Sequence, residues 1–284
     1  MKRRSLIRAA AALGSAPLLP VMNTQAGRFT GKIRKSLKWS MAQKAAEGMP
    51  LADAFKKLRS CGFAGVEPSL LGHVTRENAA EWIDASATSG LIIDGTVGGR
   101  TEGIEAGIDL TKRLGAESML LVLSYPQDQP LQKTWTEAVA RMKDAATHAE
   151  KQGIKVLVEN VWNTFLISAF DMARFIDEVG SPWVQVHFDV GNMMRWGVAE
   201  HWAEVLGKRS QKLDVKEYDL TKASNEGMHK AFDTPLGEGS INWPAVRTEL
   251  AKINYSGWAA AEVKAGDWDY LADVSQRMDK VLDL

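Results

Sequence analysis

Strand-like and helix-like segments alternate along almost the whole chain, and this alternation restricts the fold more than any other feature of the sequence. The strand-like runs are short and apolar, whereas the helical runs carry apolar residues three and four positions apart. Glycine or proline marks several of the boundaries between them. We predict strands at residues 33–40, 65–67, 92–97, 118–124, 155–160, 185–189, 212–216 and 257–263. A helix is expected after each strand, the last at residues 270–284.

Eight strand–helix pairs follow one another within residues 27–284, which we expect to form one domain. This stretch has about 258 residues, close to the ~250 that are typical of a parallel eight-stranded barrel. The predicted fold class is therefore α/β, with a single-domain (β/α)8 TIM barrel. An open, doubly wound parallel sheet is the alternative, because periodicity alone does not show whether a sheet closes.

Residues 1–26 differ in composition from the rest of the chain. Basic residues at positions 2–4 precede an apolar stretch, and a small-residue pattern follows at positions 24–26. This order is typical of an export signal peptide, and the adjacent arginines favour the twin-arginine route. A membrane anchor is the weaker alternative, because prolines interrupt a run shorter than the ~20 apolar residues of a spanning helix. We therefore expect a periplasmic protein with no membrane attachment after signal cleavage.

The balance of charges disfavours several classes of partner and cofactor. The 284 residues include 35 basic and 35 acidic side chains, so the formal net charge is zero. Nucleic-acid binding requires clustered Lys and Arg, so we expect no nucleic-acid partner. The sequence has neither a strand–GxGxxG–helix unit nor a Walker-type glycine-lysine loop, so no nucleotide cofactor is expected. The single cysteine, Cys61, cannot form an intrachain disulfide.

Four acidic residues stand at the ends of the last four predicted strands. These residues are Glu159, Asp189, Asp214 and Glu262. The C-terminal ends of the strands of a parallel barrel share one mouth, so these four side chains would lie together. Such a cluster requires either raised pKa values or a bound divalent cation. A metal accounts for all four at once, although each carboxylate alone could cap a helix or pair with a lysine.

Five further residues are candidate substrate contacts, because each lies near the same predicted mouth. They are Lys216, Glu67, His229, Trp162 and Asn192. Lys216 lies two residues after Asp214, where its ammonium group would offset the carboxylates or hold a substrate oxygen. An aromatic ring such as that of Trp162 can stack on a sugar. A solvated surface position is the competing interpretation for Lys216, Glu67 and His229, and packing against a helix is the alternative for Trp162.

Five sequence fragments, in this order, carry a resemblance to a known family. They are Val158-Glu159-Asn160, His187-Phe188-Asp189-Val190-Gly191-Asn192, Asp214-Val215-Lys216-Glu217, the stretch PLGEGSINW at residues 235–243, and Ala261-Glu262-Val263. The combination resembles the xylose-isomerase-like barrel superfamily of sugar isomerases and epimerases. The resemblance implies one divalent metal held by Glu159, Asp189, a histidine or glutamine, and Glu262. The third position departs from the family pattern, because it is Asp214 here. With oxygen ligands only, we expect Mn²⁺, or else Mg²⁺ or Co²⁺, in preference to Zn²⁺.

The resemblance also implies an activity, namely a metal-dependent isomerase or epimerase of a ketose or keto-sugar. The metal would act as a Lewis acid and stabilise the enediolate that forms when a base removes the proton beside the carbonyl group. Glu159 and Glu262 would be the catalytic base and acid. The expected partner is a small carbohydrate, and the sequence leaves a homo-oligomer open. Two alternatives remain: a lyase that eliminates the aglycone from a 3-keto-glycoside, and a non-catalytic sugar-binding barrel.

Overall fold

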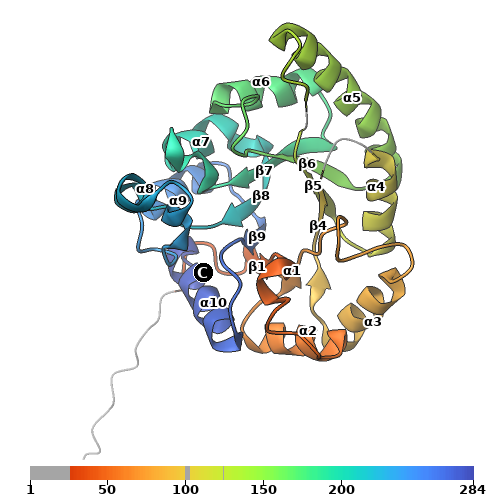
Figure 1. Cartoon of the computed structure of the whole chain (residues 1–284), viewed down its shortest axis with the longest axis vertical. Helices are drawn as coiled ribbons and strands as arrows, with labels where there is room; N and C mark the ends of the chain where they lie inside the picture. The colour runs from red at the N-terminus through yellow and green to blue at the C-terminus, as the bar shows by residue number, and fades with distance from the viewer. Residues whose placement is uncertain (1–25, 100–102, 124) are drawn as a thin grey trace, which may run out of the picture.

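Short parallel strands form the centre of the molecule, and helices surround them (Figure 1). The computed structural model describes residues 26–99, 103–123 and 125–284. The predicted export signal, apart from residue 26, and the last residue of the strand predicted at residues 118–124 lie outside these ranges. The described strands are β1 (Ile33–Leu37), β2 (Gly65–Val66), β3 (Ile92–Ile93), β4 (Thr96–Gly99), β5 (Ser118–Leu121), β6 (Lys155–Glu159), β7 (Val184–Asp189), β8 (Ser210–Val215) and β9 (Gly257–Ala261).

Strand pairing closes the sheet into a barrel. Seven strands pair in the order β1-β9-β8-β7-β6-β5-β4, and β2 pairs with β3. Two parallel bridges, Lys38 with Glu67 and Ser69 with Val97, join the two groups of strands. The strands β3 and β4 follow each other along the chain and together fill one of eight strand positions. The predicted (β/α)8 barrel is therefore confirmed, and the open-sheet alternative is wrong.

Helices cover the outside of the barrel, and most lie between successive strands. They are α1 (Trp39–Ala42), α2 (Leu51–Ser60), α3 (Ala79–Ser89), α4 (Ile104–Arg113), α5 (Leu131–Gln152), α6 (Ala169–Val179), α7 (Ala199–Leu206), α8 (Leu220–Glu226), α9 (Trp243–Lys252) and α10 (Trp268–Leu282). Apolar side chains on the inner faces of the helices are buried, for example Phe55 and Leu58 of α2 and Val274 and Met278 of α10. None of the helices in the described part of the chain is long and apolar enough to cross a membrane.

One predicted strand differs from the sequence-based expectation. The strand predicted at residues 92–97 is interrupted at Asp94 and Gly95, because β3 pairs with β2 while β4 pairs with β5. The long polar stretch between β8 and α9 has regular elements of its own. It contains α8, whose first turn is capped by the side chain of Asp219, and the short 3-10 helix η3 (Lys230–Asp233).

A buried carboxylate organises the connection between β8 and α9. Glu217 accepts hydrogen bonds from the backbone N–H groups of Tyr218 (3.1 Å), Gly237 (2.8 Å) and Ile241 (3.3 Å), and from the indole Nε1 of Trp243 (3.0 Å). These donors span the whole connection. One side chain therefore fixes the loop that follows a mouth-forming strand.

We expect Glu217→Ala to lower the free energy of unfolding by about 3 kcal/mol, because buried donors lose a charged acceptor. Urea denaturation of the purified protein measures this change. Glu238→Ala is the matched control, since the Glu238 side chain is 55% exposed and pairs with Arg277 near the surface. The control should change stability by no more than about 0.5 kcal/mol. Equal effects of the two substitutions would show that Glu217 does not organise the loop.

Candidate active site

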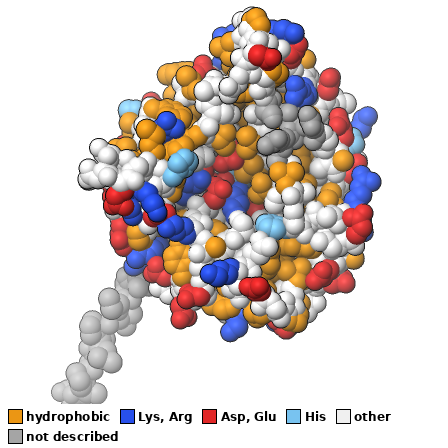
Figure 2. Space-filling model, in the orientation of Figure 1, with side chains coloured by type: hydrophobic (Ala, Val, Ile, Leu, Met, Phe, Trp, Pro, Cys, Tyr) orange, Lys and Arg blue, Asp and Glu red, His pale blue; other side chains and the backbone are white. Residues whose placement is uncertain are grey.

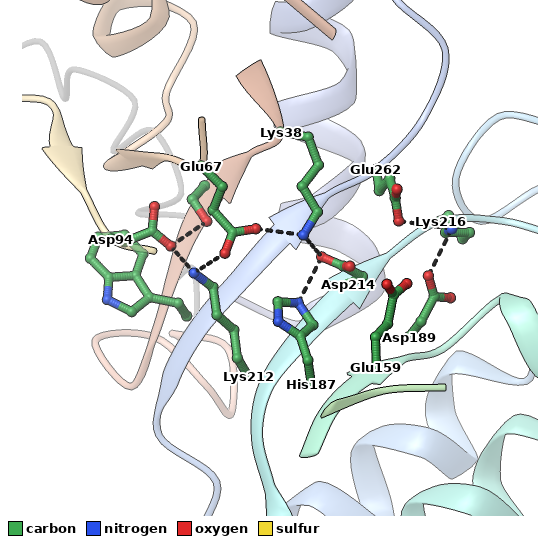
Figure 3. Close-up of polar contacts among 12 residues, drawn as sticks. Lys38, Glu67, Asp94, Glu159, His187, Asp189, Lys212, Asp214, Lys216 and Glu262 are labelled. Carbon is green, nitrogen blue, oxygen red and sulfur yellow. Dashed lines mark hydrogen bonds and ion pairs between the residues drawn. The ribbon is translucent and has the colours of Figure 1, made fainter. Parts of the chain in front are cut away.

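The barrel mouth gathers four carboxylates from four neighbouring strands (Figure 3). Glu159 ends β6, Asp189 ends β7, Asp214 lies in β8 and Glu262 follows β9. One carboxylate oxygen from each of the four residues lies within 4.8 Å of the others. The parallel register explains this arrangement, because Asp189 lies directly beside Asp214 in the pairing of β7 with β8. Residues far apart in sequence thus reach one site through the fold.

Backbone and amide groups orient Asp189 within this cluster. Its Oδ1 accepts hydrogen bonds from the N–H groups of Gly191 (2.9 Å) and Asn192 (2.8 Å). The side chain of Asn160 donates to the carbonyl oxygen of Asp189 (2.7 Å) and accepts from its N–H group (2.8 Å). One carboxylate oxygen is therefore held by the β7 turn, while the other, Oδ2, faces the cluster.

Lys216 places a positive charge at the edge of the cluster. Its Nζ lies 2.7 Å from Asp189 Oδ2 and 2.8 Å from Glu262 Oε2. It also donates to the Oδ1 of Asn192 at 3.1 Å. A Cβ at Gly191 would lie 2.4 Å from the Cγ of Lys216, so a glycine at this position lets the lysine stem pass. The structure thus puts Lys216 among the carboxylates rather than on the solvated surface.

A row of buried charges continues from Asp214 across the barrel interior (Figure 3). Asp214 Oδ1 lies 2.9 Å from both Lys38 Nζ and His187 Nε2. Lys38 also pairs with Glu67 at 2.6 Å, and Lys212 joins Glu67 to Asp94. We call the charged residues in this row and at the mouth the barrel charge network; they are Glu67, Asp94, Glu159, Asp189, Asp214, Glu262, Lys38, Lys212 and Lys216. With six carboxylates and three lysines, it has an excess of negative charge.

Burial and mutual repulsion shift the pKa values of the mouth carboxylates. Burial, followed by neighbouring carboxylates led by Glu262, raises the pKa of Glu159 well above its usual range. Burial also raises the pKa of Asp189 to about 7, against the opposing effect of Lys216. For Asp214, burial is outweighed by the adjacent His187 and Lys38, and its pKa falls well below the usual value. Asp214 is thus the most strongly anionic of these three.

A pocket of 330 Å³ lies over the mouth side of the network. Its lining combines four charged members of the network with serine, histidine and apolar side chains. The lining residues are Lys38, Ser40, Glu67, Ser69, Leu71, Gly72, His73, Val97, Leu120, Glu159 and Glu262. Figure 2 shows acidic and basic side chains at the bottom of a hollow in the middle of this face. The volume suits a small polar molecule.

Two predicted substrate contacts lie beside this pocket rather than in its lining. Trp162 packs in an aromatic cluster, with ring centroids 4.9 Å from His229 and 5.2 Å from Phe232. The guanidinium group of Arg195 lies 4.8 Å from the Trp162 ring centroid. His229 is exposed at the start of η3. The Trp162 ring is thus packed against His229, Phe232 and Arg195.

Of the other predicted substrate contacts, Glu67 and Lys216 belong to the barrel charge network, and Asn192 contacts it. Glu67 lines the pocket but is almost fully buried, and both of its carboxylate oxygens pair with lysines. Asn192 is buried, and its Nδ2 donates to Glu159 Oε1 at 3.2 Å. Because Asn192 also accepts from Lys216, it holds two site residues in position.

Sequence reasoning missed Lys38, Lys212 and Asp94 as network members. A signal for Lys38 was present, because it directly follows β1 as Glu262 directly follows β9. Lys212 lies two positions before Asp214, so it faces the same side of β8 one layer deeper. Asp94 had no comparable signal, since it occupies the break between β3 and β4.

The comparisons with known proteins agree with this geometry. A family model described as "Xylose isomerase-like TIM barrel" matches residues 55–281. The chain belongs to this xylose isomerase-like TIM barrel family. The match covers every described strand from β2 onward, including the four that carry the mouth carboxylates.

Relatives of this family member include sugar epimerases. An Escherichia coli (strain K12) protein with the provisional name L-ribulose-5-phosphate 3-epimerase is 24% identical over 265 residues, covering 83% of this chain and 87% of that protein. The E. coli 3-keto-D-glucoside 4-epimerase structure matches with a TM-score of 0.70 and 15% identity, covering 88% of this chain and 99% of that one. The IOLI protein with a bound zinc atom matches with a TM-score of 0.73 and 11% identity, covering 88% and 98%. The chain is a sugar epimerase- or isomerase-like TIM barrel.

The residues at the mouth fit a divalent cation. Four carboxylates offer oxygen atoms within 4.8 Å of one another, a spacing compatible with metal–oxygen distances of about 2.0–2.6 Å. Asp214 Oδ2 is buried and has no hydrogen-bond partner among the described residues. An ion would also offset part of the excess negative charge of the barrel charge network. Glu159, Asp189, Asp214 and Glu262 would hold it.

Proposed function

We propose that the protein is a divalent-metal-dependent epimerase or isomerase that moves a proton beside the carbonyl group of a ketose or keto-sugar. The observation that carries this proposal is the meeting of four strand-end carboxylates beside a small polar pocket. Family membership supports the same class of activity. We propose Mn²⁺ as the preferred ion, with Mg²⁺ or Co²⁺ as substitutes, because all four side chains offer hard oxygen ligands.

Glu159 and Glu262 are suited to move the proton. They are the outer members of the carboxylate cluster, on β6 and after β9, and both line the pocket. One glutamate removes the proton from carbon and the other supplies a proton, on the opposite face of that carbon for an epimerase or at the neighbouring carbon for an isomerase. A bound divalent cation would supply Lewis acidity at the carbonyl oxygen. Asp189, held by the β7 turn, positions its Oδ2 toward the cluster.

Solvent exchange tests the proposal directly. The purified protein, loaded with Mn²⁺, is incubated in D₂O with ketohexoses and with 3-keto-glucosides, and the sugars are followed by proton NMR. We expect loss of the signal from the carbon-bound hydrogen beside the carbonyl group, together with a new epimer or isomer. Absence of deuterium uptake from every carbonyl sugar tested would contradict the proposal and favour a sugar-binding barrel.

The lyase alternative begins with the same removal of a proton beside the carbonyl group, but the electron pair left on carbon then reacts differently. If the carbon next to it carries the glycosidic oxygen, the electron pair can expel the aglycone. The structure of a 3-keto-D-glucoside epimerase among the fold neighbours makes keto-glucosides a sensible substrate panel. Release of free aglycone without epimer formation in the same experiment would favour the lyase.

We expect the affinity for Mn²⁺ to fall at least about tenfold per pH unit as the pH is lowered from about 7. Burial raises the pKa of Asp189 to about 7, so below this pH an incoming cation must displace a bound proton. Glu159, whose pKa is also raised, adds to the effect. Titrations with Mn²⁺ at pH 6 and pH 8 measure the change. Equal affinities at both values would show that these carboxylates carry no proton to be displaced.

We also propose that residues 1–26 direct export through the twin-arginine route to the periplasm. The paired arginines near the start of the chain support this proposal. Replacing both Arg3 and Arg4 by lysine should abolish export, measured by cell fractionation. Undiminished periplasmic protein from the double variant would contradict it.

A further inference from the structure

Among the described residues that line the 330 Å³ pocket, Lys38 is the only lysine. It follows β1 and reaches the pocket from the side of the barrel opposite Glu159 in the strand order. Its side chain is only 5% exposed, and its Nζ lies 2.6 Å from Glu67 Oε2 and 2.9 Å from Asp214 Oδ1. A buried ammonium held by two carboxylates keeps a fixed position.

The ammonium group of Lys38 has hydrogen-bonding capacity to spare. An ammonium carries three N–H bonds. The contacts with Glu67 and Asp214 use at most two of them, and no third acceptor lies within reach among the described residues. At least one N–H therefore remains for a molecule in the pocket that Lys38 shares with Glu159 and Glu262.

We propose that Lys38 is a catalytic residue that donates a hydrogen bond to the substrate oxygen on which negative charge develops. This inference rests on the proposed function. When a glutamate removes the proton beside the carbonyl group, the C–H electron pair forms a carbon–carbon double bond and the carbonyl π pair moves onto oxygen. Lys38 keeps its proton and donates to that oxygen. When a proton returns to carbon, the electron pairs move back and the hydrogen bond weakens.

The position of Lys38 suits this task because the donor is already in place before reaction. Fixed donors aimed at a developing charge stabilise it without the reorganisation that water needs. Asp214 and Glu67 hold the ammonium group by ion pairs, and the Lys38 side chain is part of the pocket lining. A residue that only compensated buried carboxylates would not need to line the pocket.

Lys38→Met tests the proposal with the Mn²⁺-loaded protein and the sugar on which the wild type exchanges deuterium. At saturating Mn²⁺ we expect kcat to fall about 100-fold, while KM changes no more than about threefold. A wild type that exchanges no sugar would overturn the proposed function, and this inference with it. An active wild type whose Lys38→Met variant keeps its kcat would overturn the inference alone.

The double variant Lys38→Met/Glu67→Gln separates catalysis from charge compensation. It removes one positive and one negative charge, so we expect a melting temperature within a few degrees of wild type. The kcat should remain about 100-fold below that of Glu67→Gln alone. Recovery of kcat together with stability would show that Lys38 only balances charge, and would overturn the proposal.

Lys212→Met/Asp94→Asn provides a matched pair at the far end of the network. Both side chains are at least as buried as Lys38, but neither lines the pocket. We expect kcat within about threefold of wild type, because no donor to the substrate is lost. A loss as large as that of Lys38→Met would attribute the effect to disruption of the network and overturn the proposal.

Discussion

Asp189→Asn should lower the affinity for Mn²⁺ by at least about 100-fold and reduce turnover at moderate Mn²⁺ concentrations by a similar factor. The loss of groups that merely orient metal ligands costs about 10–100-fold in affinity, so loss of a charged ligand should cost more. Asparagine keeps the acceptor that the β7 turn requires, because its Oδ1 can still receive the N–H groups of Gly191 and Asn192. The change therefore removes charge at Oδ2 with little disturbance of the backbone.

Isothermal titration with Mn²⁺ and the Mn²⁺-induced rise in melting temperature both measure this loss. The metal-free variant should melt within a few degrees of the metal-free wild type, since removing one carboxylate from a repelling cluster offsets the lost contact with Lys216. Asp279→Asn is the matched control, because its carboxylate pairs with Lys35 on the outside of the barrel. Equal Mn²⁺ affinities of Asp189→Asn and the control would exclude Asp189 as a ligand.

The barrel and its mouth carboxylates could be predicted because both depend on local patterns. Strand ends of a parallel barrel meet at one face, so a carboxylate at the end of each of four strands predicts one cluster. The structure places Glu159, Asp189, Asp214 and Glu262 together in this way. Lys38 obeys the same rule at the end of β1, but a lysine is not part of the pattern of strand-end carboxylates that predicts the cluster.

The surroundings of Asp214 could not be predicted, because they depend on pairings across the barrel. Where the resemblance to the family implies a neutral histidine or glutamine, this chain has an additional carboxylate. The structure sets Lys38 and His187 each 2.9 Å from that carboxylate. Asp214 with Lys38 is net neutral as a pair, so the departure from the family pattern is compensated by a residue about 176 positions away in sequence. No local signal connects the two.

The aromatic residues near the mouth illustrate a different limit. Trp162 was a candidate stacking platform because it follows a strand that carries a carboxylate. Whether such a ring faces a pocket or a neighbouring loop depends on how the loops after β6, β7 and β8 pack. The structure surrounds Trp162 with His229, Phe232 and Arg195, a packing set by residues from three separate connections. Sequence position alone does not distinguish these outcomes.

Glu262→Gln should lower the rate of epimerisation by about 10³-fold at saturating Mn²⁺, while one epimer still exchanges its proton with solvent. In the proposed epimerase the two glutamates lie on opposite faces of the substrate carbon. Glu159, at the end of β6, therefore still removes the proton from the epimer whose C–H bond points toward it. The proton then returns to the same face, because Glu262 can no longer supply one to the other. Exchange without inversion should thus survive within about tenfold for that epimer and be lost for the other.

Proton NMR in D₂O, run separately on each epimer, measures exchange and inversion in one experiment. Glu159→Gln should give the mirror result, with exchange retained only in the epimer that Glu262 deprotonates. Mn²⁺ affinity must be determined for both variants, since each glutamine also weakens a proposed ligand. Loss of exchange for both epimers in both fully loaded variants would contradict a mechanism with one glutamate on each face. Retention of full epimerisation in either variant would remove that glutamate from the proton transfer.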